Sequence, residues 1–147
     1  MPPICACPLM PRPHPPWLCK AFHDLPPIER HHWGVHSTLH RNPHCEIAQA
    51  GAVEGGFCSI HRHRRKHNTF QVLRGCLVLD VFTGHPDRAD LQKMEVSLMP
   101  GNRPLRVSSG MWHRFRAWEP TLFLETYDGD EPEAADIERV NEGGIKD

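Results

Sequence analysis

The chain has 147 residues and a mass of 16.8 kDa, which suffices for one hydrophobic core but not for two independent domains. Apolar residues make up 39% of it and form no run long enough to cross a bilayer, which argues against a membrane protein. The net charge of −1 argues against a dedicated nucleic-acid-binding protein.

Charge is unevenly distributed along the chain. Residues 119–147 hold ten of the eighteen acidic residues and two of the seventeen basic ones, so residues 1–118 carry a surplus of seven positive charges. A basic body favours a site for anionic ligands, because a cleft lined by one sign of charge concentrates the opposite sign. Alternatively, the acidic tail packs on the body and neutralises it.

The proline-rich beginning predicts an extended arm, which together with an entry segment makes up residues 1–43. Nine of the fifteen prolines lie in the first 27 residues, and proline removes backbone donors that a sheet needs. We expect this arm to wrap over the body or over a partner subunit, or to be disordered. It has neither the basic start nor the apolar stretch of a secretory signal, so we expect a cytoplasmic protein with reduced thiols.

The cysteines give no clear metal motif. They stand at positions 5, 7, 19, 45, 58 and 76, and none forms the C-x2-C pair of a zinc ribbon. The run Cys5-Ala6-Cys7 is a weak signal by itself. Cys58 and Cys76 fall in apolar runs, where a free cysteine behaves as a small hydrophobe.

Residues 44–128 predict an all-β domain. Short apolar runs alternate with glycine and proline at intervals of roughly ten residues, which is typical of an antiparallel sandwich or small barrel. Arg74-Gly75 indicates a tight hairpin between two of the runs. The eight runs are CEIAQA, GFCSIH, TFQVL, CLVLDVF, DLQKMEVSLM, RPLRVSS, WHRFRAW and TLFLETY.

Residues 129–147 form an acidic tail with one predicted short helix. Pro132 stands early, acidic residues occupy the first turn, and Gly143-Gly144 follow Val140. Those are the residues that favour the start and the end of a helix.

Two histidines separated by one residue are the clearest chemical signal. Because side chains alternate faces along a strand, His61 and His63 project to the same side. Two neutral imidazoles in that arrangement can reach one metal ion. Gly55 and Gly75 bracket the pair, and a glycine turn at Gly110 leads into a strand that starts with a third histidine, His113.

These motifs resemble those of the cupin superfamily. Its first motif is G-x5-H-x-H-x3,4-E-x6-G and its second is G-x5-P-x-G-x2-H-x3-N. The chain matches both over about half its length, at Gly55, His61, His63, Gly75, Gly110 and His113. The resemblance implies a double-stranded β-helix, a jelly-roll barrel with a metal ion inside.

The chain departs from the family pattern at four positions. Asn68 replaces the glutamate ligand, while Asn102, Ser108 and Ala117 replace the second motif's first glycine, its proline and its final asparagine. The resemblance then implies a site of three histidines with Asn68 as a neutral fourth ligand or a hydrogen-bond donor to bound water. We expect one divalent transition metal ion of open identity: zinc, iron, nickel or, less well suited, manganese.

The residue before Asn68, His67, is a possible substitute ligand, but its odd offset places it on the opposite face of the strand. Arg62, between two inward histidines, is predicted to point outward. Arg64 to Lys66 are predicted to face water in a turn, rather than to form a nucleic-acid patch.

Four further residues are candidates for the pocket. Phe70 and Phe115 are in phase with the ligands and would be pocket wall or core. Arg106 would hold a carboxylate or phosphate if it points inward. Glu125, in an otherwise apolar run, is the candidate acid or base.

The C-terminal part resembles the sugar-isomerase group of cupins, the type II phosphomannose isomerase domain. That similarity rests on the layout LFLETYDGDEPEAADIERVNEGG and on Trp33-Gly34. It implies a metal-dependent isomerase acting on a small anionic or sugar-like molecule. The alternatives are an iron dioxygenase with three histidine ligands and a non-catalytic small-molecule-binding cupin. Strand exchange through the arm would make the protein a homodimer.

Overall fold

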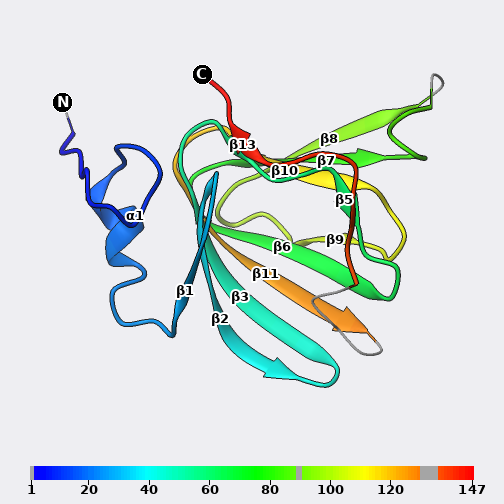
Figure 1. Cartoon of the computed structure of the whole chain (residues 1–147), viewed down its shortest axis with the longest axis horizontal. Coiled ribbons are helices and arrows are strands. Elements are labelled where there is room, and N and C mark those ends of the chain that lie inside the picture. The colour runs from blue at the N-terminus through cyan, green and yellow to red at the C-terminus, as the bar shows by residue number, and fades with distance from the viewer. Residues whose placement is uncertain (1, 89–90, 130–135) are drawn as a thin grey trace.

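The computed structural model describes residues 2–88, 91–129 and 136–147. They form two antiparallel sheets packed face to face, with the N-terminal segment at one end (Figure 1). The predicted all-β jelly roll is therefore confirmed. All eight predicted β runs coincide with strands, although GFCSIH forms two short strands instead of one.

The first sheet has six strands in the order β1-β2-β3-β11-β6-β9. Their bounds are Ile28–His31 (β1), Gly34–Asn42 (β2), Cys45–Ala52 (β3), Thr121–Gly129 (β11), Lys66–Arg74 (β6) and Leu105–Val107 (β9). All neighbouring pairs are antiparallel. β11 pairs with both β3 and β6 over nearly its whole length.

The second sheet is built around β10 (His113–Ala117). Its strands β4, β5 and β7 pair with β10, and β8, β12 and β13 extend the sheet. Their bounds are Gly56–Phe57 (β4), His61–Arg62 (β5), Leu77–Phe82 (β7), Lys93–Leu98 (β8), Glu138–Arg139 (β12) and Gly144–Ile145 (β13).

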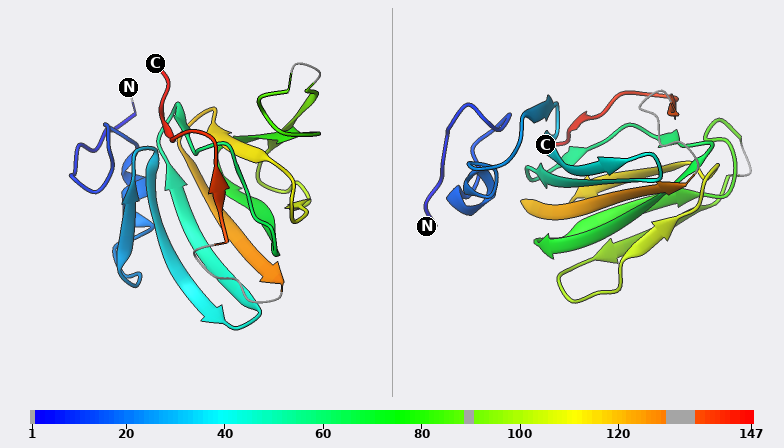
Figure 2. Two further views of the ribbon diagram at one scale, coloured as in Figure 1. Left: turned by 45° about the vertical axis from the view of Figure 1, so that its right-hand side comes forward. Right: turned by 90° about the horizontal axis from the view of Figure 1, so that it is seen from below.

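The main core lies between the two sheets, whose layers are visible in Figure 2. On β6 and β10 every second side chain is buried, as the period-2 pleat requires. Aromatic rings of Trp33, Phe70, Phe115 and Phe123 contact one another at one end of this core. The same alternation places polar side chains inward at the other end, which creates the site described below.

The predicted hairpin at Arg74-Gly75 is wrong. β6 and β7 lie in different sheets, so the chain crosses between sheets at this point. Gly75 has a φ of 97°, and a Cβ there would lie 2.3 Å from the carbonyl oxygen of Pro120. Glycine is needed here because two backbone segments cross closely. In the sequence, a glycine at such a crossing cannot be told from a glycine in a tight turn.

The barrel begins before the boundary predicted at His44. Strands β1 and β2 belong to the first sheet, so the arm proper ends near Pro27. It contains one short helix, α1 (Pro16–Lys20). Met10, Leu18 and Phe22 of the arm pack with Val35 and Val53 of the barrel in a second hydrophobic cluster, which fixes the arm to the barrel.

The predicted C-terminal helix is not found in the described part of the tail. Glu138–Arg139 pairs with β5 as a strand, and Gly144–Ile145 pairs with β4. Residues 130–135, where the helix was expected to begin, lie outside the described residues. Free edges of the second sheet offer unpaired backbone groups, and the tail satisfies them by adding strands. No helix in the described residues is long and apolar enough to span a membrane.

Asp80 is the most buried charge of the second sheet, with no exposed surface. Its carboxylate accepts hydrogen bonds from Arg114 at 3.1 Å and Arg116 at 2.8 Å, and Lys93 Nζ lies 3.9 Å away. We expect Asp80→Ala to lower the free energy of unfolding by about 2 kcal/mol. This loss is smaller than the loss typical of breaking a buried ion pair, because the cations left without their partner, Arg114, Arg116 and Lys93, are partly exposed to water.

The matched control is Glu95→Ala, since Glu95 pairs with the same Arg116 and Lys93 but its side chain is half exposed. An exposed pair contributes about 0.5 kcal/mol. Urea unfolding of both variants measures the difference. Equal losses in the two variants would contradict the assignment of Asp80 as the central anion.

Candidate metal centre

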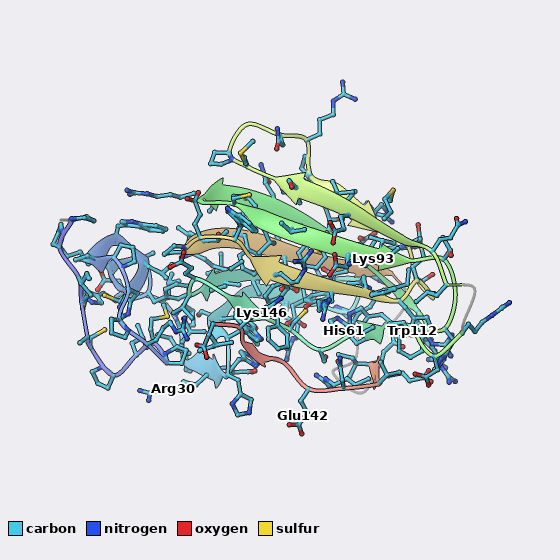
Figure 3. All side chains as sticks on the ribbon, turned by 90° about the horizontal axis from the view of Figure 1, so that it is seen from above. Arg30, His61, Lys93, Trp112, Glu142 and Lys146 are labelled. Carbon is cyan, nitrogen blue, oxygen red and sulfur yellow. The ribbon has the colours of Figure 1, made fainter. Side chains whose placement is uncertain are left out.

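Three buried histidines meet at the polar end of the barrel. His61 on β5 and His113 on β10 are directly opposite each other in the ladder, and His63 follows two residues after His61. One ring nitrogen from each lies within 4.8 Å of those from the others. Their exposed fractions are 7%, 1% and 4% for His61, His113 and His63. Figure 3 shows His61 among the side chains of the barrel, whereas Glu142 projects away from it.

Backbone carbonyl groups hold all three rings in the same tautomer. Nδ1–H donates to Ser59 O at 2.8 Å from His61, to Asp136 O at 2.8 Å from His63, and to Met111 O at 2.9 Å from His113. The lone pair of each ring is then on Nε2. A carbonyl on the far nitrogen is the usual way in which proteins orient a histidine ligand.

The histidines are neutral at pH 7. Burial lowers the pKa of His63 and of His113 to about 4, and burial together with the two neighbouring rings lowers that of His61 well below its usual range. A neutral imidazole is the form that binds a metal ion.

Two buried atoms support the presence of a ligand in this site. Among the described residues, His63 Nε2 and Asn68 Oδ1 are buried side-chain atoms without a hydrogen-bond partner. Buried polar groups are nearly always paired, so orphans at one point indicate a missing partner. Asn68 projects from β6, in the sheet opposite, and its Nδ2 lies 3.5 Å from His113 Nε2. Three imidazoles and an amide oxygen fit a divalent transition metal ion.

The tail supports the site from outside. Besides the carbonyl that orients His63, Asp136 accepts backbone N–H bonds from Arg64, Arg65 and Lys66 through its carboxylate, at 2.9 to 3.2 Å. These hydrogen bonds lower the pKa of Asp136 against the effect of its burial. The tail therefore positions a metal ligand and the loop that follows it.

His67 is not positioned as a ligand. Its Nδ1 accepts the backbone N–H of Ser109 at 3.1 Å, and it alternates with the inward side chains of Lys66 and Asn68. This is the opposite face of the strand, as its odd offset predicts.

His61 and His63 line a pocket of about 1130 Å³. Phe70 and Phe115 line it and also belong to the hydrophobic core, with 1% and 2% exposure, so they are both wall and core. At the rim, the His31 ring stacks on Trp33 with centroids 4.7 Å apart and hydrogen-bonds to His36 at 2.6 Å. The sequence had suggested no role for His31 and His36.

Glu125 is placed in the pocket as predicted. It projects from β11, is 8% exposed, and accepts a short hydrogen bond from the hydroxyl of Tyr127. Burial raises the pKa of Glu125, and the hydrogen bonds from Tyr127 and Asn68 oppose this rise. A carboxyl group with a raised pKa near a metal site is suited to proton transfer at neutral pH.

Arg106 does not reach the pocket. It pairs with Thr69 across the ladder, whereas its neighbour Val107 faces the core opposite Asn68. Its guanidinium donates two hydrogen bonds to the carboxylate of Asp128, at 3.0 and 3.1 Å, on the outer face. The predicted phase was off by one residue, which moves a side chain to the other side of the sheet.

Lys66 also differs from the prediction, because it is buried rather than solvated. It is 6% exposed, lines the pocket, and holds its ammonium 4.4 Å from the centre of the Tyr127 ring. Burial lowers its pKa. The sequence analysis did not place Lys66 or Tyr127 in the pocket, although strand phase could have done so. Lys66 precedes Asn68 by two positions, and Tyr127 follows Glu125 by two.

The other basic residues of this stretch face outward as predicted. Arg62 and Arg64 both donate to the carboxylate of Glu138, and the Arg62 guanidinium lies 4.9 Å from the centre of the Trp112 ring. These contacts join the loop to the tail.

Without metal, the protein should lose stability as the pH falls from about 6.5 towards 4. His63 and His113 stay neutral when folded and become protonated when unfolded in this window, so the unfolded state binds more protons. Each contributes a slope of at most about 1.4 kcal/mol per pH unit. Urea unfolding in a chelator at pH 7 and pH 5 measures this loss.

The loss should be smaller in His63→Gln and unchanged in His44→Gln, which replaces an exposed histidine. A pH slope as steep in His63→Gln as in the unaltered protein would contradict the assignment.

No family model and no curated protein matches the sequence. Several solved structures are similar to this chain in fold. Oxalate decarboxylase from Bacillus subtilis superposes with a TM-score of 0.66 at 13% identity, over 81% of this chain and 31% of that one. CapF, solved with an inhibitor, 3-isopropenyl-tropolone, superposes with a TM-score of 0.63 at 15% identity, over 78% and 34%.

A further structure of the same decarboxylase, from a study of its Mn(II) centres, gives a TM-score of 0.64 at 12% identity, over 78% of this chain and 30% of that one. The chain thus spans about a third of the length of these neighbours. The similarity to phosphomannose isomerase is not confirmed by these neighbours. The neighbours are cupin-fold proteins, and this chain has the cupin fold with a three-histidine candidate metal site.

Proposed function

We propose that this cupin is a metal-dependent isomerase that moves a proton between adjacent carbons of a small, anionic, sugar-like molecule. The observation that carries the proposal is the Glu125 carboxyl group, buried in the pocket that His61 and His63 also line and held by the Tyr127 hydroxyl. An isomerase needs a positioned acid or base beside a site that polarises oxygen. Glu125 stands on β11, and two of the three histidines, His61 and His113, stand on β5 and β10.

A divalent ion bound to the histidines would polarise the carbonyl and the neighbouring hydroxyl of the substrate. Glu125 would take the proton from one carbon and return it to the next, while the hydroxyl proton passes to the former carbonyl oxygen. Tyr127 would keep the carboxylate oriented between the two transfers. The reaction is a rearrangement and needs no co-reactant.

Basic side chains in the pocket support an anionic substrate, although the lining also holds four glutamates, so the support comes from the place of one cation and not from the sum of charges. Lys66, Arg30 and Arg139 line the pocket, and Lys66 is buried beside Tyr127. A cation in a partly dry pocket binds a phosphate or carboxylate more strongly than a solvated one does. Arg41 also lines the pocket, but its guanidinium is already bonded to Glu46 at 3.0 Å.

A second candidate is an oxygen-dependent iron enzyme. It is favoured by Asn68, which leaves the site with neutral ligands only, as in the cupin-like thiol dioxygenases that use three histidines. A non-catalytic small-molecule-binding protein is the third candidate and needs no chemistry from Glu125.

The homodimer expected from strand exchange through the N-terminal arm also stays a prediction.

Activity assays on aldose–ketose pairs, with and without phosphate, test the proposal under anaerobic conditions after loading with zinc, manganese, nickel or iron(II). Turnover without oxygen that disappears in His61→Ala supports the isomerase. Oxygen consumption on thiols or diketones with iron alone would overturn it in favour of the dioxygenase. Metal-dependent ligand binding without turnover on any substrate would overturn it in favour of the binding protein.

A further inference from the structure

Three cysteines and one histidine of the arm come together at a second point, outside the pocket. Cys5, Cys7, His14 and Cys19 each offer one donor atom, and all four donors lie within 4.8 Å of one another. In sequence they form C-x-C-x6-H-x4-C, which matches none of the usual zinc spacings. The fold, rather than the spacing, assembles the group.

The distances match a tetrahedral site. Cys5 Sγ and Cys19 Sγ are 3.7 Å apart, and Cys7 Sγ lies 3.5 Å from His14 Nε2. Around one zinc ion with Zn–S of about 2.3 Å and Zn–N of about 2.0 Å, tetrahedral angles place two sulfurs about 3.8 Å apart and sulfur and nitrogen about 3.5 Å apart. Disulfide-bonded sulfurs would be about 2.0 Å apart.

His14 is oriented as a metal ligand. It is 2% exposed, and its Nδ1–H donates to the carbonyl oxygen of Arg12 at 2.9 Å, which leaves the Nε2 lone pair directed at Cys7. A backbone bridge holds the opposite side: Cys5 N–H donates to His14 O at 2.7 Å, and His14 N–H donates to Cys5 O at 3.0 Å. The hydrogen bond from His14 Nδ1 to a backbone carbonyl is the same kind of contact that orients the three histidines of the barrel.

The arm needs such a link more than the barrel does. Within residues 2–27 the regular structure is the five-residue α1 and the single bridge between Cys5 and His14. Cys19 belongs to α1, while Cys5 and Cys7 precede the loop that carries Met10 into the cluster on the barrel. Segments too small for a core of their own are commonly held by a metal ion.

We propose that Cys5, Cys7, His14 and Cys19 bind one structural Zn²⁺ ion that cross-links the N-terminal arm and so holds Met10, Leu18 and Phe22 in place to pack on the barrel. With four protein ligands the site is closed, as structural zinc sites are, and no position is left for a substrate. Binding converts thiols to thiolates and releases their protons. The site is separate from the three histidines and does not depend on the function proposed for them.

Cobalt(II) substitution distinguishes the two sites, because cobalt bound to thiolates gives an intense charge-transfer band in the near ultraviolet and histidine ligands do not. The full chain is reduced, stripped of metal and titrated with Co²⁺ and then with Zn²⁺. We expect the thiolate band with one equivalent of cobalt per chain, and its disappearance when zinc displaces the cobalt. The band should persist in His61→Ala.

Cys5→Ser and Cys19→Ser should weaken the band, because each keeps two of the three thiolates, and should weaken zinc binding at this site by at least about 100-fold, since removing a ligand costs no less than removing the group that orients it. The matched controls are Cys45→Ser and Cys76→Ser, whose cysteines lie outside the cluster and are partly exposed, as Cys5 is. Both control variants should keep the cobalt–thiolate band.

Alkylation of the unaltered protein gives a second measurement that does not depend on whether the variants fold. Zinc should protect the thiols of Cys5, Cys7 and Cys19, as mapped by mass spectrometry. A wild-type protein that shows no thiolate band and no zinc protection, or that contains a Cys5–Cys19 disulfide under reducing conditions, would overturn the proposal.

Discussion

Replacing His113 by alanine is expected to remove one equivalent of bound metal per chain. His113 is the most buried of the three histidines, it stands opposite His61 in the ladder, and its Nε2 lies 3.5 Å from Asn68 Nδ2. Two remaining imidazoles and a neutral amide would form a much weaker site, so we expect affinity to fall by at least about 100-fold. Elemental analysis after dialysis, together with metal titration, measures this loss.

His67→Ala is the matched control, because His67 lies beside Asn68 in sequence but bonds to Ser109 on the other face of β6. It should leave metal content unchanged. Because the arm cluster uses none of these residues, any zinc held there should be retained in both variants. Equal metal content in His113→Ala and the unaltered protein would show that the histidines of the barrel are not the ligands.

The barrel was predictable because its strands are short and clearly separated. Glycine and proline mark most of the ends, and the apolar runs between them have few other uses in a chain of this size. Strands β1 and β2 escaped the same reasoning. They contain Glu29, Arg30, His36, His40 and Arg41, and the second half of β2 is exposed, so they lack the apolar alternation that predicts a strand. Pairing with β3 makes them strands, and that is a tertiary effect.

The three histidines could be predicted because their spacing is local. Strand phase places His61 and His63 on one face, and the glycine turn at Gly110 leads directly to His113. Arg106 shows the limit of this reasoning: the three-residue strand β9 gives too little pattern to fix the phase. Two further features depend on how distant segments of the chain meet, and residue spacing alone does not predict that. They are the hydrogen bonds from Asp136 and the cluster of Cys5, Cys7, His14 and Cys19.

The largest effect on turnover is expected from Glu125→Gln. Glutamine is of the same size and can still accept the hydrogen bond from Tyr127, but it cannot take a proton from carbon. We expect kcat to fall by about 10² to 10⁴, the usual contribution of a positioned acid or base, with little change in KM or in metal content. Steady-state kinetics on the isomerised substrate, with elemental analysis of the same samples, measures this effect.

Two further variants separate proton transfer from structure. Tyr127→Phe removes the hydrogen bond that orients the carboxylate but leaves the base, so its loss in kcat should be smaller than that of Glu125→Gln. Arg106→Ala breaks the outer pair with Asp128 and should leave kcat unchanged. Since burial raises the pKa of Glu125, the activity carried by its carboxylate form should be lost as pH falls through that raised value. A Glu125→Gln protein that keeps both full activity and the same acid limb of its pH profile would exclude Glu125 as the base and leave the metal site without a proton acceptor on β11.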